Sequence, residues 1–341
     1  MPLKNAKWIW GSAEARPDEY SEFLEELTVS GREAFLYISA DSNYAVYMNG
    51  ALCGFGQYAD FPHDKVYDKI DLSKYMRRGK NVLAVRVWYY GIADSSTYYP
   101  GKAGVIYSLY VDGEERVYSS ARTRARLSRA YVPYKVKRIT GQLGLSFEYD
   151  AKCADGWLLG ESEADYPFGP AYETGALLPL RPRSCERLRF GETVTGKPCE
   201  DNGVVPVSKY GRIFDLGREA VGFICLEFTA TGEKPITVAF GEHTVDGHVR
   251  QLVGGRDFSF IYHPTVGKNF YMNPYRRCGC RFVEIICDEP LLDVKVTLRI
   301  TEYPVTDSEA PEGLTPKQKK IYDACVNTLK CCMHEHYEDC P

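Results

Sequence analysis

Three glycine-containing dipeptides, each lying between runs of strand-forming residues, constrain this sequence most strongly. They are Asn49-Gly50, Asp112-Gly113 and Asp246-Gly247. Asn-Gly and Asp-Gly tolerate the positive φ angles of a two-residue hairpin turn, so each predicts two antiparallel strands joined by a tight turn. The third turn is expected to join 236–241 to 249–253. Because strand signals continue to about residue 305, we predict a mainly β chain.

The periodicity changes near the end of the sequence. Thr315-Pro316-Lys317-Gln318 has the pattern of a capping box, with a hydroxyl N-cap, proline at the first helical position and glutamine at the third. The apolar residues that follow recur at helical spacing and share one face: Ile321, Cys325, Leu329 and Cys332. We therefore predict one amphipathic helix over roughly residues 316–336.

The order of these signals predicts two antiparallel, jelly-roll-like β-sandwich domains followed by a C-terminal helix. The first sandwich is expected over 1–150, and a proline- and glycine-rich connector over 151–190. The second sandwich is expected over 191–305. Residues 306–341 would hold a linker and the first helix of a truncated α-helical catalytic domain.

The charge composition argues against a polyanionic partner. The 42 basic and 46 acidic residues leave a net charge of −4, so we expect a neutral partner and no binding to nucleic acid. The alternating Arg122, Arg124 and Arg126 are expected on one solvent-exposed strand face. No signal peptide and no long apolar span is evident, which predicts a cytoplasmic protein that does not enter a membrane. Twelve cysteines without regular spacing predict free thiols.

An aromatic run offers candidate binding residues. A strand ends in Trp88, Tyr89 and Tyr90, and the loop after it holds Tyr98 and Tyr99. Aromatic faces pack against the C–H faces of sugar rings, and binding residues concentrate on loops. We predict that these five residues contact a saccharide or glycoside. Packing inside the sandwich is the alternative.

Histidines and cysteines near the C-terminus invite a metal-site interpretation. His334 and His336 lie close in sequence to Cys331, Cys332 and Cys340. A helix places residues i and i+2 about 200° apart, so the two imidazoles would converge only if the helix had ended. Elsewhere, Cys278 and Cys280 would share one face of a strand as buried thiols. We expect no metal and no cofactor.

Three stretches of the sequence resemble the α-L-rhamnosidase family of glycoside hydrolases. The first is 38–50 together with 68–72 and 79–85. The second is 213–217, followed by 241–247 and 279–285, which resembles the sandwich that precedes the family's catalytic barrel. The third is the tail from His334 to Pro341, which ends in Glu-Asp-Cys-Pro.

The resemblance implies hydrolysis of terminal rhamnosides with inversion in an intact enzyme. It places the general-acid glutamate after Pro341 and the base further downstream, so no catalytic residue is expected in this chain, which would be inactive alone. Asp339 matches a family position whose carboxylate contacts the substrate. We expect Glu335 and Glu338 to be solvated or to cap the helix. A non-catalytic carbohydrate-binding protein is the main alternative, and a scaffold that only braces a helical barrel is a further one.

Overall fold

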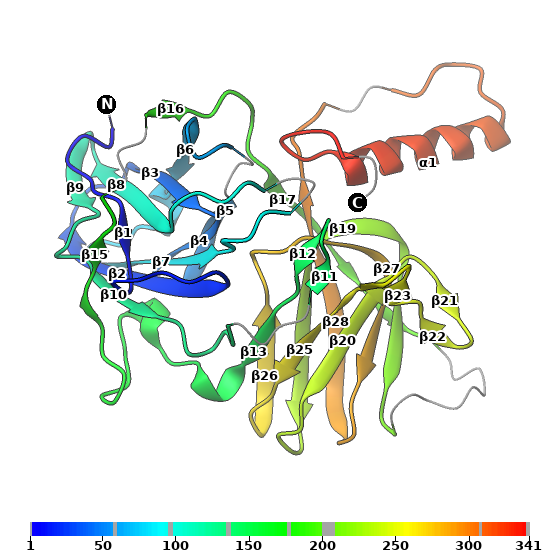
Figure 1. The fold of residues 1–341 in the computed structure, drawn as a ribbon. Helices are drawn as coiled ribbons and strands as arrows, with labels where there is room; N and C mark the ends of the chain where they lie inside the picture. Colours follow the sequence, from blue (N-terminus) through cyan, green and yellow to red (C-terminus); the bar gives the residue numbers. More distant parts are fainter. Residues whose placement is uncertain are drawn as a thin grey trace. The chain divides into compact units, whose positions relative to one another are not determined.

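The computed structural model describes residues 2–56, 60–94, 98–133, 138–175, 179–199, 209–306 and 309–338. The chain divides into two compact units, Met1–Ser184 and Cys185–Pro341. Strands dominate both units, and the single α-helix among the described residues is near the C-terminus (Figure 1). The predicted fold class, mainly β with a C-terminal helix, is confirmed.

The first unit is a sandwich of two sheets (Figure 1). One sheet has the order β15 (Tyr172–Glu173), β1 (Ile9–Trp10), β8 (Gly104–Val111), β3 (Ala34–Asp41), β6 (Lys65–Asp71) and β16 (Leu180–Pro182), with β9 (Glu114–Tyr118) paired to β8. The other has the order β14 (Gly169–Pro170), β10 (Arg124–Leu127), β2 (Glu19–Val29), β7 (Gly79–Tyr89), β4 (Asn43–Met48) and β5 (Ala51–Gly56). The short strands β11 (Arg138–Thr140), β12 (Gly144–Leu145) and β13 (Glu148–Asp150) follow, and the 3₁₀ turns are η1 (Ser73–Tyr75), η2 (Ala151–Cys153) and η3 (Trp157–Leu159).

The core of the first unit lies between these two sheets. Leu36 and Leu109 come from one sheet, Phe23 and Val85 come from the other, and all four are at most 1% exposed. Side chains of a strand point alternately to its two faces, so each sheet contributes every second residue to this core. The outer face of the second sheet is also covered in part, because Arg126 on β10 is buried. The predicted exposed arginine face is therefore wrong at Arg126.

The first two predicted hairpins are present. Asn49 and Gly50 have φ angles of 53° and 82° and join β4 to β5. Asp112 and Gly113 have φ angles of 49° and 82° and join β8 to β9. Positive φ at both central residues is the requirement of the turn that matches the twist of paired strands.

The segment expected to be a connector adds strands to the first unit. β14 pairs with β10, β15 pairs with β1, and β16 pairs with β6 in parallel. Arg183 then forms a buried ion pair with Asp68 of β6. Residues 151–184 therefore extend both sheets of the first sandwich.

The second unit is built on one long strand. The strand order is β25 (Ser259–His263), β20 (Ile236–Gly241), β27 (Cys278–Ile286), β19 (Arg212–Ala230), β28 (Leu291–Glu302) and β17 (Arg189–Thr195), and β18 (Lys197–Pro198) and β26 (Gly267–Met272) also pair with β19. Two short pairs complete the strands, β21 (Thr244–Val245) with β22 (His248–Val249) and β23 (Leu252–Val253) with β24 (Arg256–Asp257). β19 changes partners along its length, pairing with β27 in its first part and with β28 and β26 in its second. Ile224 of β19 and Leu298 of β28 lie opposite each other in this sheet and are 3% and 0% exposed.

β19 is interrupted by a β-bulge, and residues of this bulge belong to the candidate functional site. Its register against β27 shifts between Asp215 and Ala220, and Gly217 has a φ angle of 82°. Glycine adopts this left-handed conformation without steric cost. Arg218 and Glu219 therefore lie outside the regular β19–β27 pairing.

The third predicted hairpin is shorter than expected. Asp246 and Gly247 form the turn, with φ angles of 52° and 76°, but they join only β21 to β22. β20 pairs instead with β25 and β27. Val245 is 45% exposed, so the hairpin has little buried face that would favour longer strands.

The helix begins as predicted and ends early. α1 (Pro316–Cys332) starts at a capping box in which Thr315 Oγ1 accepts from the Gln318 amide at 3.3 Å. It ends because Met333 adopts an extended conformation. On the predicted apolar face, Ile321 and Leu329 are 55% and 51% exposed, so the described residues do not cover this face. The helix instead contacts β19 through Cys331, which is 6% exposed.

Two further sequence predictions can be compared with the described residues. None of their helices is both long and apolar enough to cross a membrane. The cysteines among them are free thiols. Cys278 and Cys280 share the buried face of β27, as predicted, and burial raises the pKa of Cys278 to about 12.

Candidate functional site

The predicted aromatic residues divide into a buried and an accessible group. Trp88 is 3% exposed, its ring stacks on Tyr20 at 5.5 Å, and its Nε1 donates to Asp18 at 3.0 Å. Tyr90 is 6% exposed, and its hydroxyl accepts from the Leu145 amide at 2.9 Å. Neither presents an open ring face, so both fit the packing alternative. The sugar-contact prediction for this region rests on the other residues.

Asp41, at the end of β3, holds the loop that carries the accessible tyrosines. Its carboxylate accepts from the Tyr98 hydroxyl and, at 2.8 Å, from the Gly101 amide. The Tyr89 hydroxyl donates to the Gly101 carbonyl at 3.0 Å. Burial raises the pKa of Asp41, and these hydrogen bonds together with the charge of Lys65 oppose that rise. Tyr89 and Tyr98 therefore support the loop with their hydroxyls.

A second loop is anchored beside the first. Lys65 Nζ lies 2.6 Å from Asp60 Oδ1, and these side chains are 4% and 3% exposed. Asp60 also accepts from the Val66 amide at 2.8 Å. A side chain added at Gly101 would come within 3.5 Å of Pro62, so the two loops are adjacent.

Both loops present aromatic rings to solvent. Tyr99 is 64% exposed and Phe61 is 57% exposed. His63 stacks on Phe61, with 5.5 Å between the ring centroids. We call Phe61, His63 and Tyr99 the aromatic rim. It contains one predicted residue, Tyr99; Phe61 was missed, although an aromatic–proline pair between two strand signals marks a loop.

The C-terminal turn brings together residues that helical spacing would have separated. Because α1 ends at Cys332, His334 and His336 lie in a turn in which the His334 amide donates to the His336 carbonyl at 2.9 Å. Their ring centroids are 5.0 Å apart. The condition that the sequence set for convergence, a helix that ends before these histidines, is therefore met, and the predicted helix end at about residue 336 is wrong. His334, His336 and Glu338 each offer one ligand atom, and these atoms lie within 4.8 Å of one another.

Charged groups surround this turn. Glu335 forms an ion pair with His334 and is 3% exposed, so its predicted solvated or capping role is wrong. Glu338 lies 3.4 Å from His336 and 3.8 Å from Arg277. Burial would raise the pKa of Glu338, but His336 and Arg277 outweigh burial and leave that pKa below its ordinary value. Asp339, the predicted substrate contact, lies outside the described residues.

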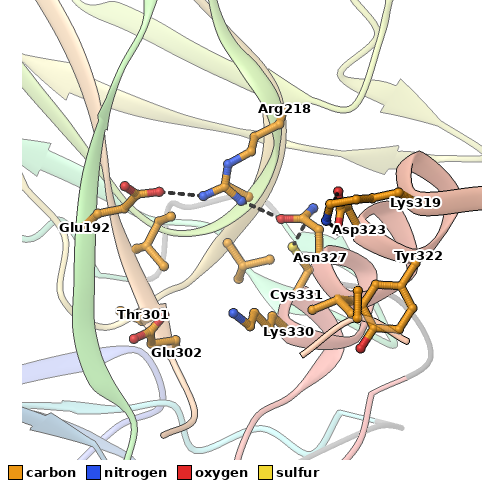
Figure 2. Close-up of a pocket in the computed structure, with 15 residues that line it drawn as sticks. Glu192, Arg218, Thr301, Glu302, Lys319, Tyr322, Asp323, Asn327, Lys330 and Cys331 are labelled. Carbon is orange, nitrogen blue, oxygen red and sulfur yellow. Dashed lines mark hydrogen bonds and ion pairs between the residues drawn. The ribbon is translucent and has the colours of Figure 1, made fainter. Parts of the chain in front are cut away.

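A groove of about 570 Å³ lies where α1 passes β17, β19 and β28 (Figure 2). Arg218 donates to Glu192 at 2.7 Å on one side and to Asn327 at 2.5 Å on the other (Figure 2). Asn327 also donates to the Glu219 carbonyl at 3.1 Å. The groove is lined by charged groups of both signs, so its lining alone does not select a charged ligand.

Glu219, in the β19 bulge, has a strongly perturbed carboxyl. Burial, followed by the negative charge of Glu242, raises the pKa of Glu219 to about 7. Its Oε1 is buried and makes no hydrogen bond within the described residues. Arg281 opposes the shift but is itself paired with Asp215 at 2.8 Å. No periodicity in the sequence distinguishes this glutamate.

Comparisons with known proteins reveal the fold. No family model matches the chain, and no curated protein matches it. Solved structures, in contrast, do match the chain. The GH78 family rhamnosidase of Bacillus sp. GL1 matches with a TM-score of 0.83 and 17% identity, over 99% of this chain and 59% of that one. The α-L-rhamnosidase from Dictyoglumus thermophilum matches with a TM-score of 0.77 and 18% identity, over 100% of this chain and 41% of that one.

A third structure, native α-L-rhamnosidase from Aspergillus terreus, has a TM-score of 0.76 and 18% identity over 99% of this chain and 41% of that one. The chain thus spans between 41% and 59% of these three structures. The likeness confirms, at the level of the fold, the resemblance to an N-terminal portion of α-L-rhamnosidases.

Proposed function

We propose that this chain is the N-terminal part of an α-L-rhamnosidase-like glycoside hydrolase, which in its intact form releases terminal rhamnose with inversion. The observation that carries the proposal is the fold likeness to the Bacillus sp. GL1 rhamnosidase over 99% of the chain. Three structures named as rhamnosidases share this arrangement of strands and helix. All three are named as rhamnosidases, and this supports rhamnose as the sugar that the intact enzyme releases.

The chain is proposed to be inactive without further residues. Inverting hydrolysis needs one carboxyl to protonate the leaving oxygen and a second to activate water, about 6.5 to 9.5 Å away. The family resemblance places both beyond Pro341. In this proposal Asp339 contributes a substrate contact and no proton transfer.

The exposed side of α1 is in keeping with this proposal. Ile321 and Leu329 expose more than half of their surface. In an intact enzyme, helices of the catalytic domain would cover these side chains. Burying an exposed leucine or isoleucine contributes about 1.5 to 3 kcal/mol, which would help to hold such a domain against the helix.

An activity assay tests the proposal. The purified 341-residue chain and a longer polypeptide, which continues into the residues that follow in the gene, are given a panel of aryl glycosides. We expect the longer polypeptide to hydrolyse the α-L-rhamnoside and the shorter chain to release no aglycone. Inactivity of a folded longer polypeptide on the whole panel would contradict the proposal.

A carbohydrate-binding role without catalysis is the second candidate, and the aromatic rim favours it. Tyr99 and Phe61 offer exposed rings on loops anchored by Asp41 and Asp60. Stacking on a sugar requires such an accessible face. In this view the first unit holds the saccharide by itself.

Titration calorimetry of the chain with rhamnose-containing oligosaccharides tests the second candidate. Tyr99→Ala and Phe61→Ala should each weaken binding roughly tenfold, which is about 1.4 kcal/mol. Tyr172→Ala, at a tyrosine that is 50% exposed on β15, is the matched control and should bind normally. Equal binding by all three variants would exclude the rim as the sugar contact.

A further inference from the structure

We propose that His334, His336 and Glu338 form a binding site for one divalent transition-metal ion, with Zn²⁺ as the best match. Each residue offers one ligand atom, and the three atoms lie within 4.8 Å of one another. Zinc binds imidazole nitrogen and carboxylate oxygen at about 2.0 to 2.2 Å, which places ligands of one ion about 3 to 4 Å apart. A modest side-chain rotation closes the remaining gap.

The backbone of the turn holds these ligands near one another without a metal. Met333 and Tyr337 form an antiparallel bridge across the turn. The His334 amide donates to the His336 carbonyl at 2.9 Å, and the Glu338 amide donates to the Cys332 carbonyl at 2.9 Å. The fold has thus already ordered part of the site, which reduces the conformational entropy that is lost when the ion binds.

A second carboxylate stands behind the first histidine. Glu335 pairs with Nδ1 of His334 and is 3% exposed. Metal-binding histidines commonly turn one ring nitrogen to a carboxylate, which orients the ring and leaves the other nitrogen for the ion. With Nδ1 facing Glu335, Nε2 of His334 would be the nitrogen left for the ion.

The charges that face the turn favour a cation. Glu335 and Glu338 carry two negative charges, and Arg277, 3.8 Å from Glu338, carries one positive charge. With neutral imidazoles the net charge is −1. A bound dication would change the net charge of the turn from negative to positive, and Arg277 would repel it to some extent. We therefore expect Zn²⁺ to bind in the micromolar range, more weakly than at the tightest structural zinc sites.

The ligand types select among metals. Two imidazoles and one carboxylate are the donors of zinc sites that keep one position open. Mg²⁺ and Ca²⁺ prefer all-oxygen surroundings, so they should bind poorly. The three ligand side chains are 18%, 33% and 25% exposed, which leaves solvent a path to the ion.

Metal titration of the complete 341-residue chain tests this site. After treatment with EDTA, isothermal titration with Zn²⁺ should show one site per chain. Co²⁺ should give a visible d–d spectrum without a thiolate-to-cobalt charge-transfer band, because no cysteine is among the proposed ligands. Ring ¹H–¹⁵N spectra should show His334 and His336 shifting with Zn²⁺.

Variants separate this site from other histidines and cysteines. His336→Ala and Glu338→Gln should each weaken Zn²⁺ binding at least about tenfold, since losing one of three protein ligands removes a metal bond. Cys331→Ser with Cys332→Ser, and separately His243→Ala, should leave binding unchanged.

The proposed metal site is contradicted if titration to millimolar Zn²⁺ produces no heat and no shift of the His334 or His336 ring signals. It is equally wrong if the cysteine variant, rather than the histidine variant, loses binding. Should His336→Ala fail to fold, the wild-type cobalt spectrum and the near-isosteric Glu338→Gln decide between these outcomes. None of these readouts depends on glycoside hydrolysis, so failure of the metal site is distinguishable from failure of the proposed function.

Discussion

Oε2 of Glu22 on β2 lies 2.8 Å from Nε of Arg126 on β10, and these side chains are 3% and 7% exposed. The other oxygen of Glu22 pairs with Arg86 at 3.1 Å, and Arg126 also pairs with Asp155 at 2.8 Å. Three neighbouring strands and the segment after η2 therefore share one buried network of charges. It links residues 151–184 to the first sandwich.

Replacing Glu22 should destabilise the first unit severely. Glu22→Ala leaves two buried guanidinium groups without their shared partner, and breaking a buried pair in this way costs about 3 to 5 kcal/mol. Glu26→Ala is the matched control on the same strand, where Lys80 and Arg124 are solvent-exposed partners and the expected cost is about 0 to 1 kcal/mol. Denaturant unfolding measures both. Similar costs for the two variants would refute the network's role.

Glu219 should make stability fall as the pH rises. The pKa of Glu219 is raised from 4.5 to about 7 in the folded chain, so folding favours the protonated carboxyl. The stability that this protonated form contributes is fully present below pH 4.5 and is lost as the pH rises through about 7. Glu219→Gln should therefore be more stable than wild type at about pH 8, by at most about 2 kcal/mol after solvent screening, and equal to it at about pH 4. Urea unfolding at both pH values measures the difference.

Glu242→Gln is the control for that experiment. Removing the like charge should lower the pKa of Glu219 and reduce the wild-type pH dependence only in part, because burial is the larger cause. A Glu219→Gln variant with the same pH dependence as wild type would contradict this account.

The capping box should contribute measurably to α1. Thr315→Ala removes the hydroxyl that accepts from the Gln318 amide at 3.3 Å, and losing such a cap costs about 1 kcal/mol. Thr328→Ala, in the helix interior, removes only a bond to the Ala324 carbonyl and replaces threonine with a better helix former. That variant should be neutral or slightly stabilising. Thermal unfolding followed by circular dichroism should separate the two variants.

Local chemistry explains which features the sequence could predict. The turns at Asn49-Gly50 and Asp112-Gly113 and the cap at Thr315 depend on residues close together in the chain, and all three are present. Helical spacing identified an apolar face on the helix, but it could not show that this face is left exposed by the described residues. Cys331 and Asn327 make the contact instead, through the Glu219 carbonyl.

Long-range partners explain what the sequence could not predict. Arg126 looked exposed by its strand alternation, and only the three-dimensional position of Glu22 and Asp155 makes its burial favourable. The aromatic rim takes Phe61 and Tyr99 from two separate loops, and the sequence does not show that Gly101 of one loop lies next to Pro62 of the other. The convergence of His334 with His336 required knowing that α1 ends at Cys332.

The anomeric form of the first sugar released tests the proposed function most directly. An aryl α-L-rhamnoside is incubated with the longer polypeptide, and ¹H NMR follows the newly formed rhamnose before the anomers equilibrate, with the 341-residue chain alone as the blank. We expect β-L-rhamnose to appear first, and no rhamnose in the blank. Rapid release of rhamnose by the 341-residue chain, or an α anomer as the first product of the longer one, would contradict the account.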